Sequence, residues 1–346
     1  MVRNIIGDLL AKLPILDLNL PAYKPCGRYT QDRMELFNKN NKGFLLDEEH
    51  KLLHYFMMVH QDAFTWNDTE RGHFREDFFP AIEIPVVPHK PWVQKNIQIL
   101  PGIYEEVCQV LQHKIDAEVV EPSNASYQSH WFCVVKKDGK SLCIVQSLEL
   151  LNEITIQHSG MLPFLEQLVE HFAARVCGSM LDLYIGYNEQ ALAKSSCDLT
   201  TFQTPFGAMW LTALPMGWTN SVPIFHDDIT YILRPEIPHI TQPYIDNVLV
   251  RGPTTWYVLP SGEEEWIPQN PGICQFVWEH FQDLNHICQR MKYSGGTFSG
   301  FKTFLCVPEI SILGQHCTIK GHLVDENHII KVKTWAPCTD LSDVPI

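Results

Sequence analysis

Residues 241–250 read TQPYIDNVLV, two short apolar runs that flank Asp246 and Asn247. Both central residues tolerate the left-handed backbone of a tight turn, so the segment predicts a β-hairpin with a carboxylate at its tip. A second carboxylate, Asp182, lies inside the apolar run MLDLYIG of residues 180–186, which predicts a short buried strand. A charge at either place is costly unless it is paired or binds a cation. Carboxylates that project together from neighbouring strand ends are the ligands that hard divalent cations require.

Taken separately, each of these patterns also fits an ordinary surface aspartate at a strand end or a turn. The spacing of Asp182 and Asp246 does not show by itself that the two side chains are neighbours. A cation site therefore needs support from the rest of the chain.

The segments around these two strands alternate between short strands and helices. WFCVVKK and LCIVQSL flank Asp138-Gly139, which predicts a second hairpin. Apolar residues at helical spacing predict helices over residues 48–64, 103–115, 163–173, 219–233 and 275–292. Asp47 is expected to cap the first of these helices, and Thr219 or Asn220 the fourth. The order of elements predicts an α+β fold, an antiparallel sheet with helices on one face.

Length and turn signals suggest the domain organisation. The 346 residues are enough for about two domains. Residues 1–42 carry scattered turn signals and are expected to be irregular, and five prolines between residues 80 and 101 predict a boundary or linker. Residues 252–272 are acidic and rich in Pro and Gly, which is typical of a solvated loop.

The composition excludes several classes of protein. A formal net charge of −14 excludes a basic protein that coats nucleic acid non-specifically, although a local basic groove remains compatible with it. Eleven dispersed cysteines without a C-x-x-C pair predict buried thiols in a reducing compartment and indicate neither a zinc site nor a disulfide framework. His280 and His286 do not have metal-ligand spacing and are interpreted as packing or surface residues. The start of the chain is a poor signal peptide and no run of 18 apolar residues occurs, so we expect an intracellular protein that does not enter a membrane.

Several motifs then follow one another in the order found in one family. They are EPSNASYQSHWFCVVKKDGK (121–140), LNEITI (151–156), MLDLYIGY (180–187), TTFQTPFGAMWLTALPMGWTNSVPIFH (200–226), YIDN (244–247), GGTFSGFKTFLC (295–306) and ISILG (310–314). Together they resemble the reverse transcriptase domain of gypsy-type long-terminal-repeat retrotransposons, as in fungal genomes, over about residues 85–335. The resemblance implies a right-hand polymerase fold with palm and fingers, and a palm sheet that brings Asp182 and Asp246 together.

The resemblance also implies that the catalytic residues are Asp182, Asp246 and Asn247. Asp182 and Asp246 would hold two Mg²⁺ ions, or Mn²⁺ in their place, which activate the primer 3′-hydroxyl and stabilise the leaving pyrophosphate. Lys302 matches a palm lysine that acts as an acid toward pyrophosphate, although a surface lysine is an equally good interpretation. The partners implied are an RNA or DNA template-primer and deoxynucleoside triphosphates.

Lys302 and five further residues would bind the incoming nucleotide. Lys136 or Lys137 would neutralise the triphosphate. Tyr187, five residues after Asp182, would stack under the sugar and exclude a 2′-hydroxyl. The backbone around Met216 and Gly217 would line the pocket, because a glycine allows close approach.

The sequence departs from the family pattern at important positions. Asn247 replaces the second carboxylate of the hairpin, and an amide lacks the negative charge that a divalent cation prefers. Cys143 stands where the family has an arginine that clamps the triphosphate. The implied organisation is an N-terminal extension (1–84), irregular and then helical, fingers and palm (85–322), and a truncated start of the thumb and connection (323–346). Ribonuclease H and integrase would belong to the rest of a polyprotein.

Two functions remain open on these grounds. The first is an RNA-directed DNA polymerase domain that works by a two-metal mechanism, weakened at Asn247. The second is a catalytically inactive, retrotransposon-derived remnant that binds nucleic acid. An unrelated hydrolase is disfavoured because the chain lacks an Asp-Thr-Gly signature, a G-x-S-x-G elbow and a P-loop.

Overall fold

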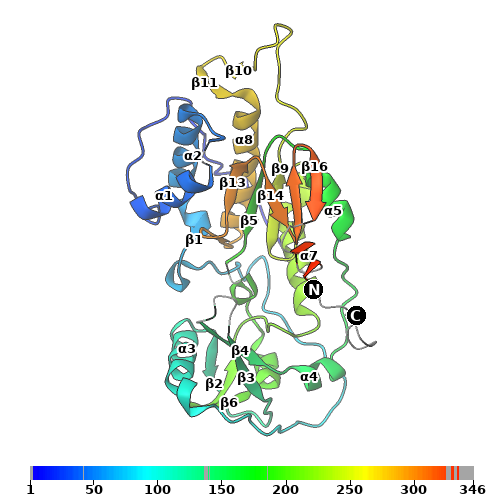
Figure 1. Cartoon of the computed structure of the whole chain (residues 1–346). Helices are drawn as coiled ribbons and strands as arrows, with labels where there is room; N and C mark the ends of the chain where they lie inside the picture. The colour runs from blue at the N-terminus through cyan, green and yellow to red at the C-terminus, as the bar shows by residue number, and fades with distance from the viewer. Residues whose placement is uncertain are drawn as a thin grey trace.

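The palm is built on a four-stranded antiparallel sheet with the strand order β13-β5-β9-β8. The computed structural model describes residues 3–41, 43–135, 139, 141–184, 186–324, 329–330 and 333–334. In Figure 1 the palm forms the upper body and the fingers form the lower body. The palm strands are β5 (Gly178–Asp182), β8 (Thr241–Tyr244), β9 (Asn247–Arg251) and β13 (Phe304–Val307).

Both faces of the palm sheet are buried, which explains why its strands are apolar without clear alternation. Leu181 and Val248 point into the main hydrophobic core, which fills one face. Met180 and Leu249 point into a second, smaller core on the opposite face. Successive side chains of a strand point to opposite faces, so the backbone geometry alone assigns these residues to their cores.

Two long helices, α7 (Ser221–Leu233) and α8 (Gln275–Tyr293), pack on the main-core face. They confirm the helices predicted over 219–233 and 275–292. The cap of α7 differs from the expectation: Asn220 is at the N-cap position, but its side chain accepts from the backbone N–H of His158 and donates to the carbonyl of Ile156. Asn220 therefore ties a neighbouring loop to the start of the helix.

The opposite face is covered by one helix and a small sheet, where the sequence predicted helices on one face only. This layer consists of α5 (Leu165–Phe172) and an antiparallel sheet of β14 (Ile310–Ile312), β15 (Gln315–Thr318) and β16 (Gly321–Val324). Figure 1 shows β16 and α5 next to each other on the side of β9 away from α8. Residues 310–324 supply the sheet of this layer. Its strands are too short and too polar for the sequence to predict them.

The fingers have a core of their own, formed by Val107, Leu111, Trp131, Phe202, Met209 and their neighbours. Its elements are α3 (Tyr104–Asp116), β2 (Val120–Pro122), β3 (Trp131–Val135), β4 (Leu142–Gln146), β6 (Phe202–Thr204) and β7 (Gly207–Leu211). The helix α4 (Glu149–Ile154) follows β4 along the chain. The predicted hairpin is confirmed, because β3 and β4 pair antiparallel. Cys133 is opposite Ile144 and Cys143 is opposite Val134, so the two thiols lie on different faces of the hairpin.

The N-terminal segment contains a helix where the sequence predicted irregular chain. This helix, α1 (Gln31–Asn40), buries Phe37 completely. The next helix, α2 (Asp47–Val59), begins one residue earlier than predicted, because Leu46 takes the N-cap position in place of Asp47. In Figure 1 both helices lie beside α8 and β13.

The N-terminal segment shares its core with the palm. Phe56 of α2 packs edge-on against Phe281 of α8 with the ring centroids 5.4 Å apart. The Asn41 amide donates to the backbone carbonyls of Leu305 and Cys306, at 2.7 and 3.0 Å. The N-terminal segment and the palm thus pack against each other without a gap in the core. The domain boundaries at 84/85 and 322/323 stay predictions.

Short elements complete the described chain. The acidic segment 252–272 is mostly exposed, as predicted, and leads into a small hairpin. None of the described helices is long and apolar enough to cross a membrane. The remaining elements are η1 (Gln61–Ala63), β1 (Phe64–Thr65), η2 (Asp68–Glu70), η3 (Pro101–Ile103), η4 (Gly186–Glu189), α6 (Lys194–Cys197), η5 (Asp198–Thr200), η6 (Arg234–Glu236), β10 (Trp266–Ile267), β11 (Asn270–Cys274) and β12 (Phe298–Ser299).

Replacing Gly295 with alanine is expected to lower the free energy of unfolding by about 3 kcal/mol. Gly295 follows α8 with a φ of +89°, and a Cβ there would lie 2.1 Å from the backbone carbonyl oxygen of His73. Gly262→Ala is the control, because Gly262 has a φ of +87° and nothing within 4 Å of such a Cβ; it should cost about 1 kcal/mol. Urea denaturation measures both, and equal losses would contradict the role of the His73 contact.

Candidate active site

The antiparallel register of β5 and β9 brings Asp182 and Asp246 to the same edge of the palm sheet. Asp182 is the last residue of β5 and pairs with Asn247, the first residue of β9. The pairing extends past the strand end, because the backbone N–H of Leu183 donates to the carbonyl of Asp246 at 2.8 Å. The two aspartates therefore lie on adjacent, hydrogen-bonded segments.

The turn that carries Asp246 lies one residue earlier than the sequence predicted. Tyr244 pairs with Asn247, so the two turn residues are Ile245 and Asp246. Ile245 has a φ of +56°, and a β-branched residue in this left-handed region is strained. Its backbone N–H donates to Nδ1 of His226 on α7 at 3.3 Å. The interaction with His226 supports the strained turn.

The carboxyl group of Asp182 is ionised at a cost. Burial raises its pKa above the ordinary value, the Lys302 ammonium opposes that shift, and the charge of Asp246 adds to it. Lys302 Nζ donates to Asp182 Oδ1 at 3.0 Å. The Lys302 side chain is 67% exposed and that of Asp182 is 12% exposed. The ammonium group of the exposed Lys302 side chain thus contacts a nearly buried carboxylate. Asp182 and Asp246 also offer the oxygen ligands that a divalent cation needs.

Asn247 forms a hydrogen bond with the side chain of Asp246. Its Nδ2 donates to Asp246 Oδ1 at 3.0 Å. An aspartate at position 247 would present an additional acceptor, whereas the amide uses a donor to occupy one carboxylate oxygen. The described residues of this strand edge therefore offer two carboxylates, and one of these has an oxygen already hydrogen bonded.

Tyr187 lies on η4, close to Asp246. Its ring packs edge-on against Phe225 of α7 with the centroids 5.1 Å apart. Gly186 allows this approach, because a Cβ there would lie 2.4 Å from the Phe225 ring. Burial, followed by the charge of Asp246, raises the pKa of Tyr187 to about 12. The phenol therefore stays neutral and its ring is held in one place beside Asp246.

Met216 and Gly217 lie on the loop between β7 and α7. Gly217 has a φ of +92°, which favours glycine. Asn152 of α4 holds this loop on both sides: its Nδ2 donates to the Gly217 carbonyl at 3.0 Å, and its Oδ1 accepts from the Thr219 N–H at 2.8 Å. The Leu-Asn motif that contains Asn152 did not by itself indicate this role.

A cavity of about 120 Å³ lies where fingers and palm meet beside this loop, and it is lined by Met216, Cys143 and Gln146 among others. Met216 is 68% exposed. The structure thus places Cys143 at the fingers side of the cavity, where the resemblance implied an arginine. Lys136 and Lys137, the other predicted nucleotide-binding residues, lie outside the described residues.

The palm sheet, its helices and the fingers together define a right-hand polymerase fold, with Asp182 and Asp246 at the edge of the palm. Comparison with solved structures supports this class. The foamy viral protease-reverse transcriptase in complex with an RNA/DNA hybrid superposes with a TM-score of 0.75 at 18% identity, over 93% of this chain and 40% of that chain. The same protein in complex with double-stranded DNA gives 0.76 at 19% identity, over 94% and 53%.

Curated sequences lead to the same class. The chain is 25% identical over 211 residues to the retrovirus-related Pol polyprotein from transposon 412 of Drosophila melanogaster, which covers 58% of this chain and 17% of the relative. The gypsy polyprotein of the same organism is 25% identical over 172 residues, 48% of this chain and again 17% of the relative. An RNA-directed DNA polymerase homolog of Oenothera berteroana is 27% identical over 100 residues, 29% of this chain and 70% of the relative. No protein-family model matches the chain.

The chain therefore has the fold, and the sequence relatives, of retrotransposon and retroviral reverse transcriptases, which are nucleotidyltransferases. It corresponds to a small part of the length of the polyproteins it matches. The curated and solved relatives confirm the fold class predicted from the sequence. They do not bear on the role of any single site residue.

Replacing Asp182 with asparagine is expected to raise the free energy of unfolding at about pH 7 in metal-free buffer. The folded-state pKa of Asp182 is above its ordinary value, so its ionisation destabilises the fold at pH values above the raised pKa. This penalty disappears as the pH falls below the ordinary value, and the advantage of the variant should shrink from about pH 7 to about pH 4. Urea denaturation at both pH values measures the difference.

Asp116→Asn is the control, because Asp116 is an exposed residue at the end of α3, away from the site. It should not change the free energy of unfolding. Mg²⁺ should stabilise the wild-type chain and have little effect on Asp182→Asn. A lower stability of Asp182→Asn at about pH 7 would show that Lys302 outweighs the burial of Asp182.

Proposed function

We propose that this chain is an RNA-directed DNA polymerase domain that adds deoxynucleotides to the 3′ end of a primer. One observation carries the proposal: Asp182 and Asp246 lie on adjacent hydrogen-bonded segments at the edge of a polymerase palm, with Lys302 beside them. An ordinary core would not keep a nearly buried carboxylate next to a second negative charge. The arrangement is explained when the carboxylates serve a cation.

Asp182 and Asp246 would hold the metal ions of this reaction, Mg²⁺ or Mn²⁺. Two such ions, when bound, activate the primer hydroxyl and stabilise the charge on the leaving pyrophosphate. Binding a cation requires Lys302 to leave Asp182, which its exposed side chain allows. The freed ammonium would then be available to donate a proton to the pyrophosphate.

The nucleotide would bind in the space between fingers and palm. The ring of Tyr187 would lie under the sugar, held by Phe225, and would exclude a 2′-hydroxyl by its bulk. The backbone around Met216 and Gly217 would line the pocket, positioned by Asn152. Lys136 or Lys137 would neutralise the triphosphate. Cys143 lacks the planar charged fork of an arginine, so we expect weak binding of the triphosphate.

The further partners follow from the relatives. A template-primer of RNA or DNA is the substrate of the proposed reaction, and its binding should weaken with salt because it depends on phosphate contacts. The relatives from transposons are polyproteins, so we propose that ribonuclease H and integrase accompany this domain in its natural context. The reaction would take place inside the cell.

Primer extension on an RNA template tests the proposal. The wild-type chain should extend a DNA primer in Mg²⁺ or Mn²⁺, and Asp182→Ala should reduce the rate by about 10³-fold or more. Asn247→Asp should increase the rate at least about tenfold, the effect of about 1.4 kcal/mol, because it frees Asp246 Oδ1 and restores a third carboxylate.

Asp116→Ala is the matched control and should extend the primer like the wild-type chain. If the wild-type chain does not extend a primer, and the combined variant Asn247→Asp, Cys143→Arg does, the chain is an inactive remnant that keeps the fold. If no variant extends a primer, the proposed activity is wrong.

A second experiment tests Tyr187. Tyr187→Ala should lower the discrimination between deoxynucleotides and ribonucleotides at least about tenfold, because the ring that contacts the sugar is removed. Tyr187→Phe keeps the ring and its contact with Phe225 and should keep the discrimination. The ratio of kcat/KM for the two nucleotides is the measurement. An unchanged ratio in Tyr187→Ala would show that another group excludes the 2′-hydroxyl.

A further inference from the structure

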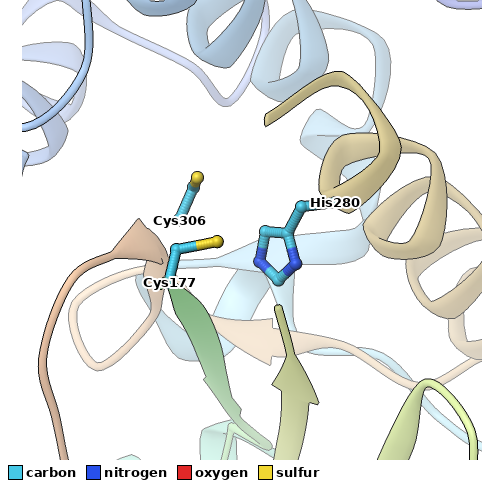
Figure 2. A group of neighbouring side chains, drawn as sticks. All are labelled: Cys177, His280 and Cys306. Carbon is cyan, nitrogen blue, oxygen red and sulfur yellow. The ribbon is translucent and has the colours of Figure 1, made fainter. Parts of the chain in front are cut away.

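Three buried side chains with metal-binding atoms converge inside the palm, away from the carboxylates. Cys177 precedes β5, Cys306 lies in β13 and His280 lies in α8. Their ligand atoms all lie within 4.8 Å of one another, and each residue is at most 2% exposed. Figure 2 shows the Cys177 sulfur pointing toward the imidazole of His280, with Cys306 beside them.

His280 presents one ring nitrogen to this group. Its Nε2 is the nitrogen on the side of the Cys177 sulfur in Figure 2, and it lies 2.7 Å from the Ser179 hydroxyl. A neutral imidazole is the form that ligates metals.

The backbone of β13 is distorted in a way that directs Cys306 into this group. The pairing of β13 with β5 is irregular between Phe304 and Val307. Cys306 lies in this irregular stretch with a φ of +48°, a strained conformation for a residue other than glycine. Its N–H donates to the Ser179 hydroxyl at 2.8 Å. Bulges of this kind re-aim a side chain, and strain of this kind concentrates at functional sites.

We propose that Cys177, Cys306 and His280 bind one Zn²⁺ ion. Thiolates and imidazole are the ligands that zinc prefers, and a water molecule would take the fourth position that the three protein ligands leave open. Two thiolates and a neutral imidazole carry two negative charges, so the zinc complex is neutral and suits a buried position. Mg²⁺ does not compete here, because it requires oxygen ligands.

The binding step is balanced by the release of two protons. Zinc displaces the proton of each thiol and forms two zinc–sulfur bonds, and nothing is oxidised or reduced.

The proposed zinc would join three elements that position the active site. Cys177 and Cys306 lie on or beside β5 and β13, the same segments that lead to Asp182 and Lys302. A zinc ion at the far end of these strands would fix them to α8. The site would act as a structural clamp, and it does not depend on the proposed polymerase activity.

Cobalt titration of the reduced full-length chain, with Mg²⁺ in excess to fill the carboxylates, tests the proposal. One Co²⁺ per chain should bind with sulfur-to-cobalt charge-transfer absorption, and Zn²⁺ should displace it. Cys306→Ala and Cys177→Ala should lower the affinity at least about 100-fold, because even loss of an outer-shell partner costs 10–100-fold. Cys288→Ala is the matched control, since Cys288 is fully buried in α8 outside the group, and it should bind like the wild-type chain.

X-ray absorption of the zinc-loaded wild-type chain gives an answer even if the cysteine variants fail to fold. It should show two sulfur ligands at about 2.3 Å and at least one nitrogen ligand. Oxygen and nitrogen ligands alone would overturn the proposal, as would charge-transfer absorption that persists without Cys177 and Cys306. A chain that binds no cobalt or zinc when reduced, and that joins Cys177 to Cys306 in a disulfide when oxidised, would show a redox pair instead. Primer extension reports separately on the carboxylates, so the two proposals can fail independently.

Discussion

The candidate active site depends on one constraint, the register in which β5 and β9 pair. Asp182 is opposite Asn247, and the Leu183 N–H reaches the Asp246 carbonyl. A shift by one residue would turn Asp182 to the other face of the sheet. The buried side chains on both faces, Leu181 and Val248 on one and Met180 and Leu249 on the other, prevent that shift. The two hydrophobic cores thus determine where the charges lie.

The same constraint explains why the site is electrostatically unfavourable in the metal-free chain. Asp182 is buried by the apolar strand that positions it, and Asp246 adds a like charge. Two nearby donors partly relieve this, the Lys302 ammonium at Asp182 and the Asn247 amide at Asp246. They differ in one respect: Lys302 is on a long exposed side chain and can leave, whereas Asn247 is part of β9. The hydrogen bond from Asn247 to Asp246 is therefore the more fixed of the two.

Local sequence patterns predicted the elements that are long or have a defined turn, such as α7, α8 and the β3–β4 hairpin. The order of the family motifs implied that Asp182 and Asp246 are neighbours, which their spacing alone did not. Features that depend on contacts between distant segments were not predictable. The turn at Ile245 takes a backbone that a β-branched residue avoids, with support from His226. Asn152 acquires its role only when the Gly217 loop packs on α4. Cys177, His280 and Cys306 come from separate elements, so no spacing rule could indicate a metal site.

The shared core of the N-terminal segment and the palm has a consequence for how the protein is made. β1 pairs with β12, and the Asn41 amide binds carbonyls of β13, so segments from near the start of the chain complete their hydrogen bonds with segments from near its end. During synthesis on the ribosome, Phe37 and Phe56 emerge long before the strands and the helix that cover them. Contacts between such distant segments fold slowly and leave apolar surface exposed in the meantime. The nascent chain should consequently depend on chaperones until the last palm strand has been translated.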